Sequence, residues 1–301
     1  MDFDGAEEML NAKPDVYFNP KVSPDGDRIA LTIMDDTGNP NIGILDIARG
    51  NIIHPIQDLR FVWSPIWSPI SQKIAFTGSL TDIYTHGIYQ MSSSGIGKIE
   101  HLHTEAMGQI YPSSFSKDGK FILCRISRPG TSSTNIGMLT IDEDIRWQIF
   151  LEDKYIKTTP QFSPDNEWIA YTSNKSGRNE VYVRSFPEAE EALEQISTDG
   201  GFSPLWSPNR SQLYYRNGDH VIAVTYDIKR GFKVVNSEVL FQDTYYSSAP
   251  PSDSLWDIHP NGKRFLMMKE AATDSKADKS RLRIDIIQNW FEELKERVPV
   301  D

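Results

Sequence analysis

Two histidines separated by one residue form the most metal-like spacing in the sequence. On a strand, His101 and His103 would present two imidazoles on one face, and imidazole nitrogen is a common zinc ligand. Two ligands are too few to hold an ion, so the spacing favours a solvent-facing pair. Residues 35–39 (DDTGN) resemble the start of a calcium-binding loop but lack the downstream glutamate. We therefore expect no metal site.

Other catalytic signatures are missing from the sequence. It contains no His-Glu-x-x-His, Cys-x-x-Cys, Gly-x-Ser-x-Gly or P-loop motif. Serine and aspartate are so common that a Ser/His/Asp set chosen from them carries no weight. The single cysteine, Cys124, lies in an apolar run and is expected to be a buried, inert thiol. These absences predict a protein that is not an enzyme and holds no cofactor.

A four-residue phrase returns six times along the chain, and its fullest form is Ser-Pro-Asp-Gly at residues 23–26. We call each copy a marker turn. The copies begin at positions 23, 68, 116, 163, 207 and 259, and successive copies are separated by 45, 48, 47, 44 and 52 residues. A sustained period of this size is typical of repeat proteins. Proline, aspartate and glycine suit a tight turn because they supply the backbone angles that it needs.

The residues around each marker turn predict four short strands per repeat. An apolar or aromatic residue precedes the turn, a short apolar run follows it, and further strand-like segments come after a polar loop. One four-stranded sheet cannot bury both of its faces alone, whereas radial packing of six copies can. We therefore predict an all-β fold, a six-bladed β-propeller of four-stranded antiparallel blades, as a single domain over residues 1–301.

The two ends of the chain leave the closure of the ring open. The sixth repeat lacks an evident fourth strand, and the N-terminal extension, residues 1–14, could supply it, although residues 6–11 suit a helix as well as a strand. A short C-terminal helix is predicted over residues 289–298. Asn289 can cap its start and form a capping box with Glu292, and Pro299 ends it.

The composition limits the classes of partner. A net charge of −11 disfavours nucleic acid, since phosphate neutralisation requires clustered lysine and arginine. No apolar run approaches the roughly 20 residues that span a bilayer, which predicts no membrane insertion. The acidic N-terminus does not resemble a secretory signal. As given, the chain is expected to be cytoplasmic, or periplasmic or otherwise extracytoplasmic if a precursor segment was removed. We expect a monomer.

In a propeller, two sets of loops build the mouth of the channel opposite the marker turns: the loops that enter each first strand and those that join second to third strands. We call this mouth the entry mouth. Its loops carry tyrosine, tryptophan and arginine, which are enriched at protein interaction hot spots. The candidate partner-binding residues are Arg60, Trp63, Tyr84, Tyr111, Arg128, Lys157, Arg178, Tyr245 and Tyr246.

Recurrence divides the aromatic and arginine residues of this mouth into two groups. Four aromatic residues lie five positions before a marker serine: Phe18, Trp63, Tyr111 and Phe202. Their recurrence favours a packing role in the channel or between blades. Direct contact with a partner is favoured instead for Tyr245, Tyr246, Arg128 and Arg178.

The marker turn resembles the repeat of TolB-like propellers of bacteria, in which Ser-Pro-Asp-Gly follows a proline and an aromatic residue. The last third of the chain is similar to the C-terminal propeller of bacterial serine/threonine kinases and related sensor proteins. The segments that carry this likeness are 181–187 (VYVRSFP), 195–201 (QISTDGG), 204–208 (PLWSP), 213–216 (LYYR), 264–268 (RFLMM) and 289–295 (NWFEELK). The resemblance implies binding rather than catalysis, since TolB docks partner lipoproteins and peptides at its channel mouth.

These observations predict a non-enzymatic protein- or peptide-binding propeller that acts as an interaction or sensor module through one mouth of its channel. Two alternatives stay open at this point. One is a metal-dependent polysaccharide lyase or hydrolase with its site in the channel, which would require several histidines or carboxylates to converge there. The other is a propeller that gates a catalytic domain in trans.

Overall fold

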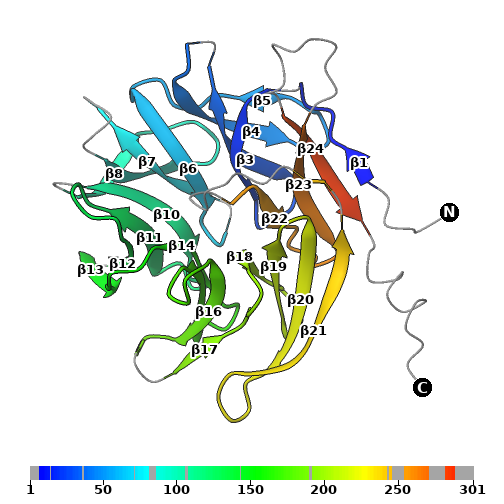
Figure 1. Cartoon of the computed structure of the whole chain (residues 1–301). Helices are drawn as coiled ribbons and strands as arrows, with labels where there is room; N and C mark the ends of the chain where they lie inside the picture. Colours follow the sequence, from blue (N-terminus) through cyan, green and yellow to red (C-terminus); the bar gives the residue numbers. More distant parts are fainter. Residues whose placement is uncertain are drawn as a thin grey trace.

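The computed structural model describes residues 7–13, 15–35, 37–70, 72–80, 86–105, 108–142, 144–189, 192–242, 244–245, 254–270 and 282–288. These residues form six antiparallel sheets of four strands each, arranged radially (Figure 1). The predicted all-β, six-bladed propeller is confirmed. The helix predicted over residues 289–298 lies outside the described residues, as do Tyr84 and Tyr246. Within the described part of the chain, no helix has the length and apolar character needed to cross a membrane.

The first five blades run outward in chain order from an inner strand that lines the channel. Blade one consists of β2 (Tyr17–Val22), β3 (Arg28–Met34), β4 (Pro40–Asp46) and β5 (Ile52–Ile53). Blade two consists of β6 (Phe61–Trp67), β7 (Lys73–Ser79), β8 (Gly87–Ser92) and β9 (Glu100–Thr104). Blade three consists of β10 (Gln109–Phe115), β11 (Phe121–Ser127), β12 (Thr134–Ile141) and β13 (Ile145–Leu151). Blade four consists of β14 (Lys157–Phe162), β15 (Trp168–Ser173), β16 (Glu180–Ser185) and β17 (Leu193–Gln195). Blade five consists of β18 (Phe202–Trp206), β19 (Gln212–Asn217), β20 (His220–Asp227) and β21 (Lys233–Gln242). Blade six is β22 (Trp256–Ile258), β23 (Arg264–Glu270), β24 (Leu282–Gln288) and, outermost, β1 (Glu7–Met9).

The marker turns join each inner strand to the second strand, and their serines hold the turn together. Ser116 is fully buried, and its hydroxyl donates to the Asp118 carboxylate at 2.6 Å and accepts the backbone N–H of Phe121 at 2.9 Å. Ser23 and Ser163 make the same two kinds of hydrogen bond in their own blades. The repeated phrase is therefore a structural device, because its polar side chains are used within the turn.

Four inner strands carry a kink at the same repeat position. The residues there have φ between 49° and 52° and each precedes a proline: Asn19, Ser64, Thr159 and Ser203. The pairing with the second strand shifts register across all four, which marks a β-bulge. Residues other than glycine rarely adopt this backbone conformation. Its recurrence therefore indicates a shared architectural need, the bending of the inner strand beside the channel.

The apolar core of the described residues is divided into six clusters, each between two neighbouring blades. Between blades one and two, Ile42 and Ile44 of β4 pack with Trp67 of β6 and Phe76 of β7. Each sheet thus buries its two faces against two neighbours, as the repeat predicts. Cys124 is buried between blades two and three, and burial raises the pKa of its thiol, in agreement with the expected inert cysteine.

The N-terminal segment supplies the outer strand that the sixth repeat lacks. β1 pairs antiparallel with β24, with Glu7 opposite Ile287 and Met9 opposite Asp285. At the inner side of the same blade, Asp257 accepts the backbone N–H of Val22 in blade one at 2.8 Å. Blade six is therefore tied to the start of the chain at both its outer and its inner edge.

Candidate functional site

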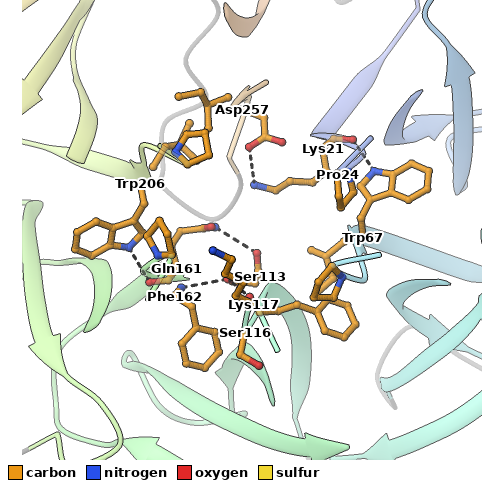
Figure 2. A pocket seen from close by; sticks show the side chains of 18 of the residues that line it. Lys21, Pro24, Trp67, Ser113, Ser116, Lys117, Gln161, Phe162, Trp206 and Asp257 are labelled. Carbon is orange, nitrogen blue, oxygen red and sulfur yellow. Dashed lines mark hydrogen bonds and ion pairs between the residues drawn. The ribbon is translucent and has the colours of Figure 1, made fainter. Parts of the chain in front are cut away.

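A cavity of about 350 Å³ opens at the channel mouth formed by the marker turns (Figure 2). We call it the marker cavity. All six blades contribute to its lining, which consists of Lys21, Val22, Pro24, Ile66, Trp67, Pro69, Ser113, Ser114, Phe115, Ser116, Lys117, Gln161, Phe162, Ser163, Pro164, Leu205, Trp206, Pro208, Asp257 and Ile258. Because these residues end the inner strands or begin the marker turns, the cavity lies on the axis of the ring.

Two tryptophans on opposite sides of the marker cavity are held rigidly (Figure 2). Trp67 Nε1 donates to the carbonyl of Lys21 in blade one at 2.8 Å, and Trp206 Nε1 donates to the carbonyl of Gln161 in blade four at 3.1 Å. Both side chains are more than nine-tenths buried. A wall that is already fixed loses little conformational freedom when a ligand binds, and this favours affinity.

The marker cavity carries more positive than negative charge. Its lining includes Lys21, Lys117 and one carboxylate, Asp257, in a chain whose net charge is −11. Lys21 Nζ lies 3.8 Å from Asp257 Oδ1, whereas Lys117 is exposed. Burial raises the pKa of Asp257, and the charge of Lys21 opposes this shift. The charge balance of the cavity lining is therefore opposite in sign to that of the chain as a whole.

The channel narrows next to the marker cavity. A chamber of about 30 Å³, roughly the volume of one water molecule, is lined by Tyr111, Arg125 and the bulge residues Asn19, Ser64 and Thr159, among others. Asn19 is buried, and its Oδ1 has no hydrogen-bond partner among the described residues. The chamber has room for a water molecule beside that oxygen. The chamber is therefore much smaller than the marker cavity beside it.

At the entry mouth, aromatic residues of the first three blades pack on one another. The ring centroid of Trp63 lies 5.2 Å from that of Phe18 and 6.0 Å from that of Phe61. The Arg125 guanidinium lies over the Tyr111 ring, 4.4 Å from its centroid. These contacts agree with the packing role that the recurrence of Phe18, Trp63 and Tyr111 favours.

Two of the predicted partner-binding residues are buried. Lys157 is 1% exposed, the Asp153 carboxylate and the Tyr155 carbonyl accept from its ammonium group, and burial lowers its pKa. Tyr245 is 5% exposed, and its hydroxyl donates to Glu7 Oε1 at 2.7 Å. Little of either side chain faces solvent. The sequence alone does not show the burial of Tyr245, because its partner Glu7 is 238 residues away.

The predicted arginines differ in exposure and pairing. Arg60 is exposed, Arg128 Nε lies 3.3 Å from Glu105, and Arg178 Nε lies 2.7 Å from the buried carboxylate of Glu180. None of the seven described candidates lines the marker cavity. Their part in partner binding stays a prediction.

The residues of the marker cavity were not among the candidate partner-binding residues that the sequence suggested. Lys21, Trp67, Lys117, Trp206 and Asp257 all lie within two positions of a marker serine or of the histidine that replaces it. That position is the one signal that could have identified them, because the ends of all inner strands meet at the axis of a propeller.

The two closely spaced histidines do not come together. The ring of His101 packs against Tyr89 with centroids 5.1 Å apart, and His103 stacks on Trp147 of blade three at 4.7 Å. A register shift in the pairing of β8 with β9 separates them. Among the residues that the structure describes, no group of three or more His, Cys, Asp or Glu could hold a metal ion. The lyase or hydrolase alternative therefore gains no ligand set from them.

A His103→Phe variant should lose less stability than the wild type on acidification. Burial lowers the pKa of His103, and the carboxylate of Glu105, 3.9 Å away, opposes this effect without cancelling it. The unfolded-state pKa is about 6.5, so the stability contributed by neutral His103 is present above that pH and is lost as the pH falls through the lower folded-state pKa. Phenylalanine can stack on Trp147 but cannot be protonated.

Urea unfolding of both proteins at about pH 7 and about pH 5 measures this difference, since histidine changes charge in that interval. The wild type should show the larger fall in unfolding free energy. Equal falls in the two proteins would show that His103 contributes nothing to the pH dependence.

Comparison with known proteins connects the fold to solved structures. No protein-family model matches the chain, and no curated protein matches it. A putative TolB from Agrobacterium tumefaciens is 20% identical, with a TM-score of 0.60 over 75% of this chain and 81% of that one. TolB from Acinetobacter baumannii is 19% identical, with a TM-score of 0.64 over 87% of this chain and 64% of that one. An oligogalacturonate lyase in complex with manganese is 10% identical, with a TM-score of 0.59 over 94% of this chain and 97% of that one.

These likenesses and the six four-stranded blades show a TolB-like propeller fold. The fold is consistent with a protein-binding module. At these identities the comparisons show the fold alone, because one propeller scaffold hosts many functions. The narrower resemblance to kinase-associated propellers stays a prediction.

Proposed function

We propose that this chain is a non-enzymatic binding module that holds a short segment of a partner protein, or a free peptide, in the marker cavity. The observation that carries the proposal is a cavity of about 350 Å³ with rigid aromatic walls, to which all six blades contribute. Ligand pockets typically measure about 300–1,000 Å³. The resemblance to TolB supports the same role, since it implies docking at a channel mouth.

The lining of the cavity suggests the chemistry of the ligand. Val22, Phe115 and Ile258 are half-buried apolar residues of the lining, and Lys117 places an exposed ammonium group at the rim. An apolar side chain of the ligand would fit the apolar lining. A neighbouring side chain with a carboxylate would pair with the exposed lysine. We therefore expect bound peptides to combine an apolar or aromatic residue with aspartate or glutamate.

The entry mouth is the competing location, and it is the one that the sequence pattern favoured. Two observations weigh against it: Lys157 and Tyr245 are buried, and Trp63 packs against its aromatic neighbours. A binding surface needs side chains that a partner can reach. The marker cavity offers a concave surface, which buries more of a small ligand than a flat surface does.

Substitution of Ser113 by tryptophan tests the proposal directly. Ser113 lines both the marker cavity and the narrow chamber, so an indole at this position would fill the space that a ligand needs. Peptides selected from a displayed random library on the immobilised wild type should bind Ser113→Trp about a hundredfold more weakly by calorimetry. Lys117→Glu should weaken the binding of acidic peptides about tenfold, because it reverses the charge at the rim.

A matched variant at the other mouth supplies the control. Ser176→Trp adds the same side chain in an exposed loop of the entry mouth, near Arg178. It should leave peptide affinity unchanged. Loss of binding in Ser176→Trp with full binding in Ser113→Trp would place the site at the entry mouth and contradict the proposal.

A further inference from the structure

The outer strand of blade five differs from the other outer strands in length. β21 has ten residues, whereas β5 has two, β9 has five, β13 has seven, and β17 and β1 have three each. It is the last strand of its sheet, and no described strand lies beyond it (Figure 1). An edge strand presents unpaired backbone N–H and C=O groups, which makes it a template for pairing with another strand.

β21 also exposes apolar side chains. Val234, Val235 and Val239 are 41%, 65% and 56% exposed. Charged side chains, above all lysine, proline and β-bulges are the common protections of an exposed edge. Here Lys233 is the only lysine in the strand, and no proline interrupts it. The strand therefore combines a long edge, beyond which no described strand lies, with exposed apolar side chains, and both features favour strand addition.

The pairing of β21 with β20 shows where its charges lie. Glu238 lies opposite Ala223, Asn236 opposite Thr225, and Lys233 opposite Asp227. The three partners on β20, Ala223, Thr225 and Asp227, are two residues apart from one another. Glu238 and Lys233 therefore lie two strand positions from Asn236, one on each side of it. Side chains two residues apart on a strand share a face, so Lys233, Asn236 and Glu238 all lie on one face of the sheet.

A bulge makes this arrangement possible. Five residues separate Lys233 from Glu238 in sequence, an odd number that would normally place them on opposite faces. The register shift between Thr225 and Tyr226 leaves Val235 as the extra residue and returns Lys233 to the face of Glu238. Neither side chain forms an ion pair with another described residue.

We infer that β21 pairs antiparallel with β21 of a second copy of this chain, about a two-fold axis through Asn236. This axis places Lys233 of each copy opposite Glu238 of the other, so that the interface contains two complementary ion pairs. On the other face, Val234 of one copy lies diagonally across from Val239 of the other, within reach of apolar contact. A different partner strand would not need this symmetric spacing of opposite charges.

The dimer goes beyond the binding role of the marker cavity and does not depend on it. β21 lies on the outer rim of the ring (Figure 1), whereas the marker cavity lies on its axis. The marker cavity of each copy therefore stays open in the dimer. The pairing would also make the monomer expected from the sequence wrong.

Sedimentation equilibrium of the full chain tests the inference, at concentrations up to about 500 µM. The wild type should form a weak dimer, since only one strand per copy pairs. Lys233→Glu and Glu238→Lys should each weaken dimerisation about tenfold, because either change sets like charges opposite each other twice. The double variant restores both ion pairs and should recover the wild-type dissociation constant to within about threefold.

Controls with the same changes in charge lie outside β21. Lys175→Glu and Glu194→Lys change exposed residues of blade four and should leave the dissociation constant unchanged. A wild type that sediments as a monomer throughout overturns the inference, whether the edge is bare or another segment of the chain covers it. So does a dimer that both single variants leave unchanged, or that the double variant fails to restore.

Discussion

Replacing Asp257 with alanine is expected to lower the free energy of unfolding by about 3–5 kcal/mol, the usual cost of removing one partner from a buried ion pair. The Asp257 carboxylate accepts the Val22 N–H at 2.8 Å and lies 3.8 Å from Lys21 Nζ. The side chains of Lys21 and Asp257 are only 14% and 13% exposed. Alanine would leave the ammonium group without a counter-charge and the N–H without its acceptor.

The effect should be large because of where Asp257 lies. It joins the inner strand of the last blade to the inner strand of the first. Urea unfolding followed by circular dichroism measures it. Arg49→Ala is a control that breaks an exposed pair with Asp46, in which Arg49 is 80% exposed, and it should cost less than about 1 kcal/mol. Equally small losses in both variants would contradict the role of Asp257 in closing the ring.

A double variant separates the cost of the uncompensated charge from the cost of lost packing. Lys21→Met with Asp257→Leu removes both charges and keeps most of the volume. Replacing a buried ion pair by apolar residues is often neutral or stabilising. This double variant should therefore unfold at a higher urea concentration than Asp257→Ala. If it is equally unstable, the unpaired ammonium group of Lys21 is not the source of the loss.

Trp256→Ala is expected to have a comparable effect, a loss of about 3–5 kcal/mol, as is usual when a buried tryptophan becomes alanine. Trp256 is 1% exposed and stacks on Phe265 with ring centroids 5.4 Å apart. Its Nε1 donates to the Ser203 carbonyl of blade five at 2.9 Å. Trp256 is the residue of the three-residue strand β22 that joins Phe265 and Met267 in the apolar cluster between blades five and six.

Two further variants divide this loss into its parts. Trp256→Phe keeps an aromatic ring but leaves the Ser203 carbonyl without its donor, and it should cost about 1–3 kcal/mol. Trp147→Ala removes a half-buried tryptophan from an outer strand and should cost less than Trp256→Ala. Thermal and urea unfolding measure all three. A loss in Trp256→Ala no greater than in Trp147→Ala would show that blade six does not depend on this contact.

The marker turns explain why the blades could be predicted so well. Ser116 bonds to Asp118 and to the N–H of Phe121, all within six consecutive residues, so the sequence pattern contains the whole interaction. The bulges are nearly as local, since a residue with positive φ precedes a proline in four blades. Each copy of such a local pattern marks one blade.

The candidate site was far less predictable. The burial of Lys157 follows from a local loop, but that of Tyr245 depends on Glu7, almost the whole chain away. The indole of Trp67 is fixed by a carbonyl of the neighbouring blade, 46 residues earlier. A pattern of exposed-looking aromatic residues in loops cannot show which of them face solvent.

By itself, the sequence determined the number of blades, the place of each marker turn and the apolar strands between them, because these depend on hydrogen bonds and alternation within a few residues. Only the tertiary structure decided that β1 completes blade six, that Tyr245 is buried and that the cavity lies at the marker mouth. Each of these depends on how closely residues from different blades approach one another. That distance is set by packing around the whole ring, and no single repeat contains it.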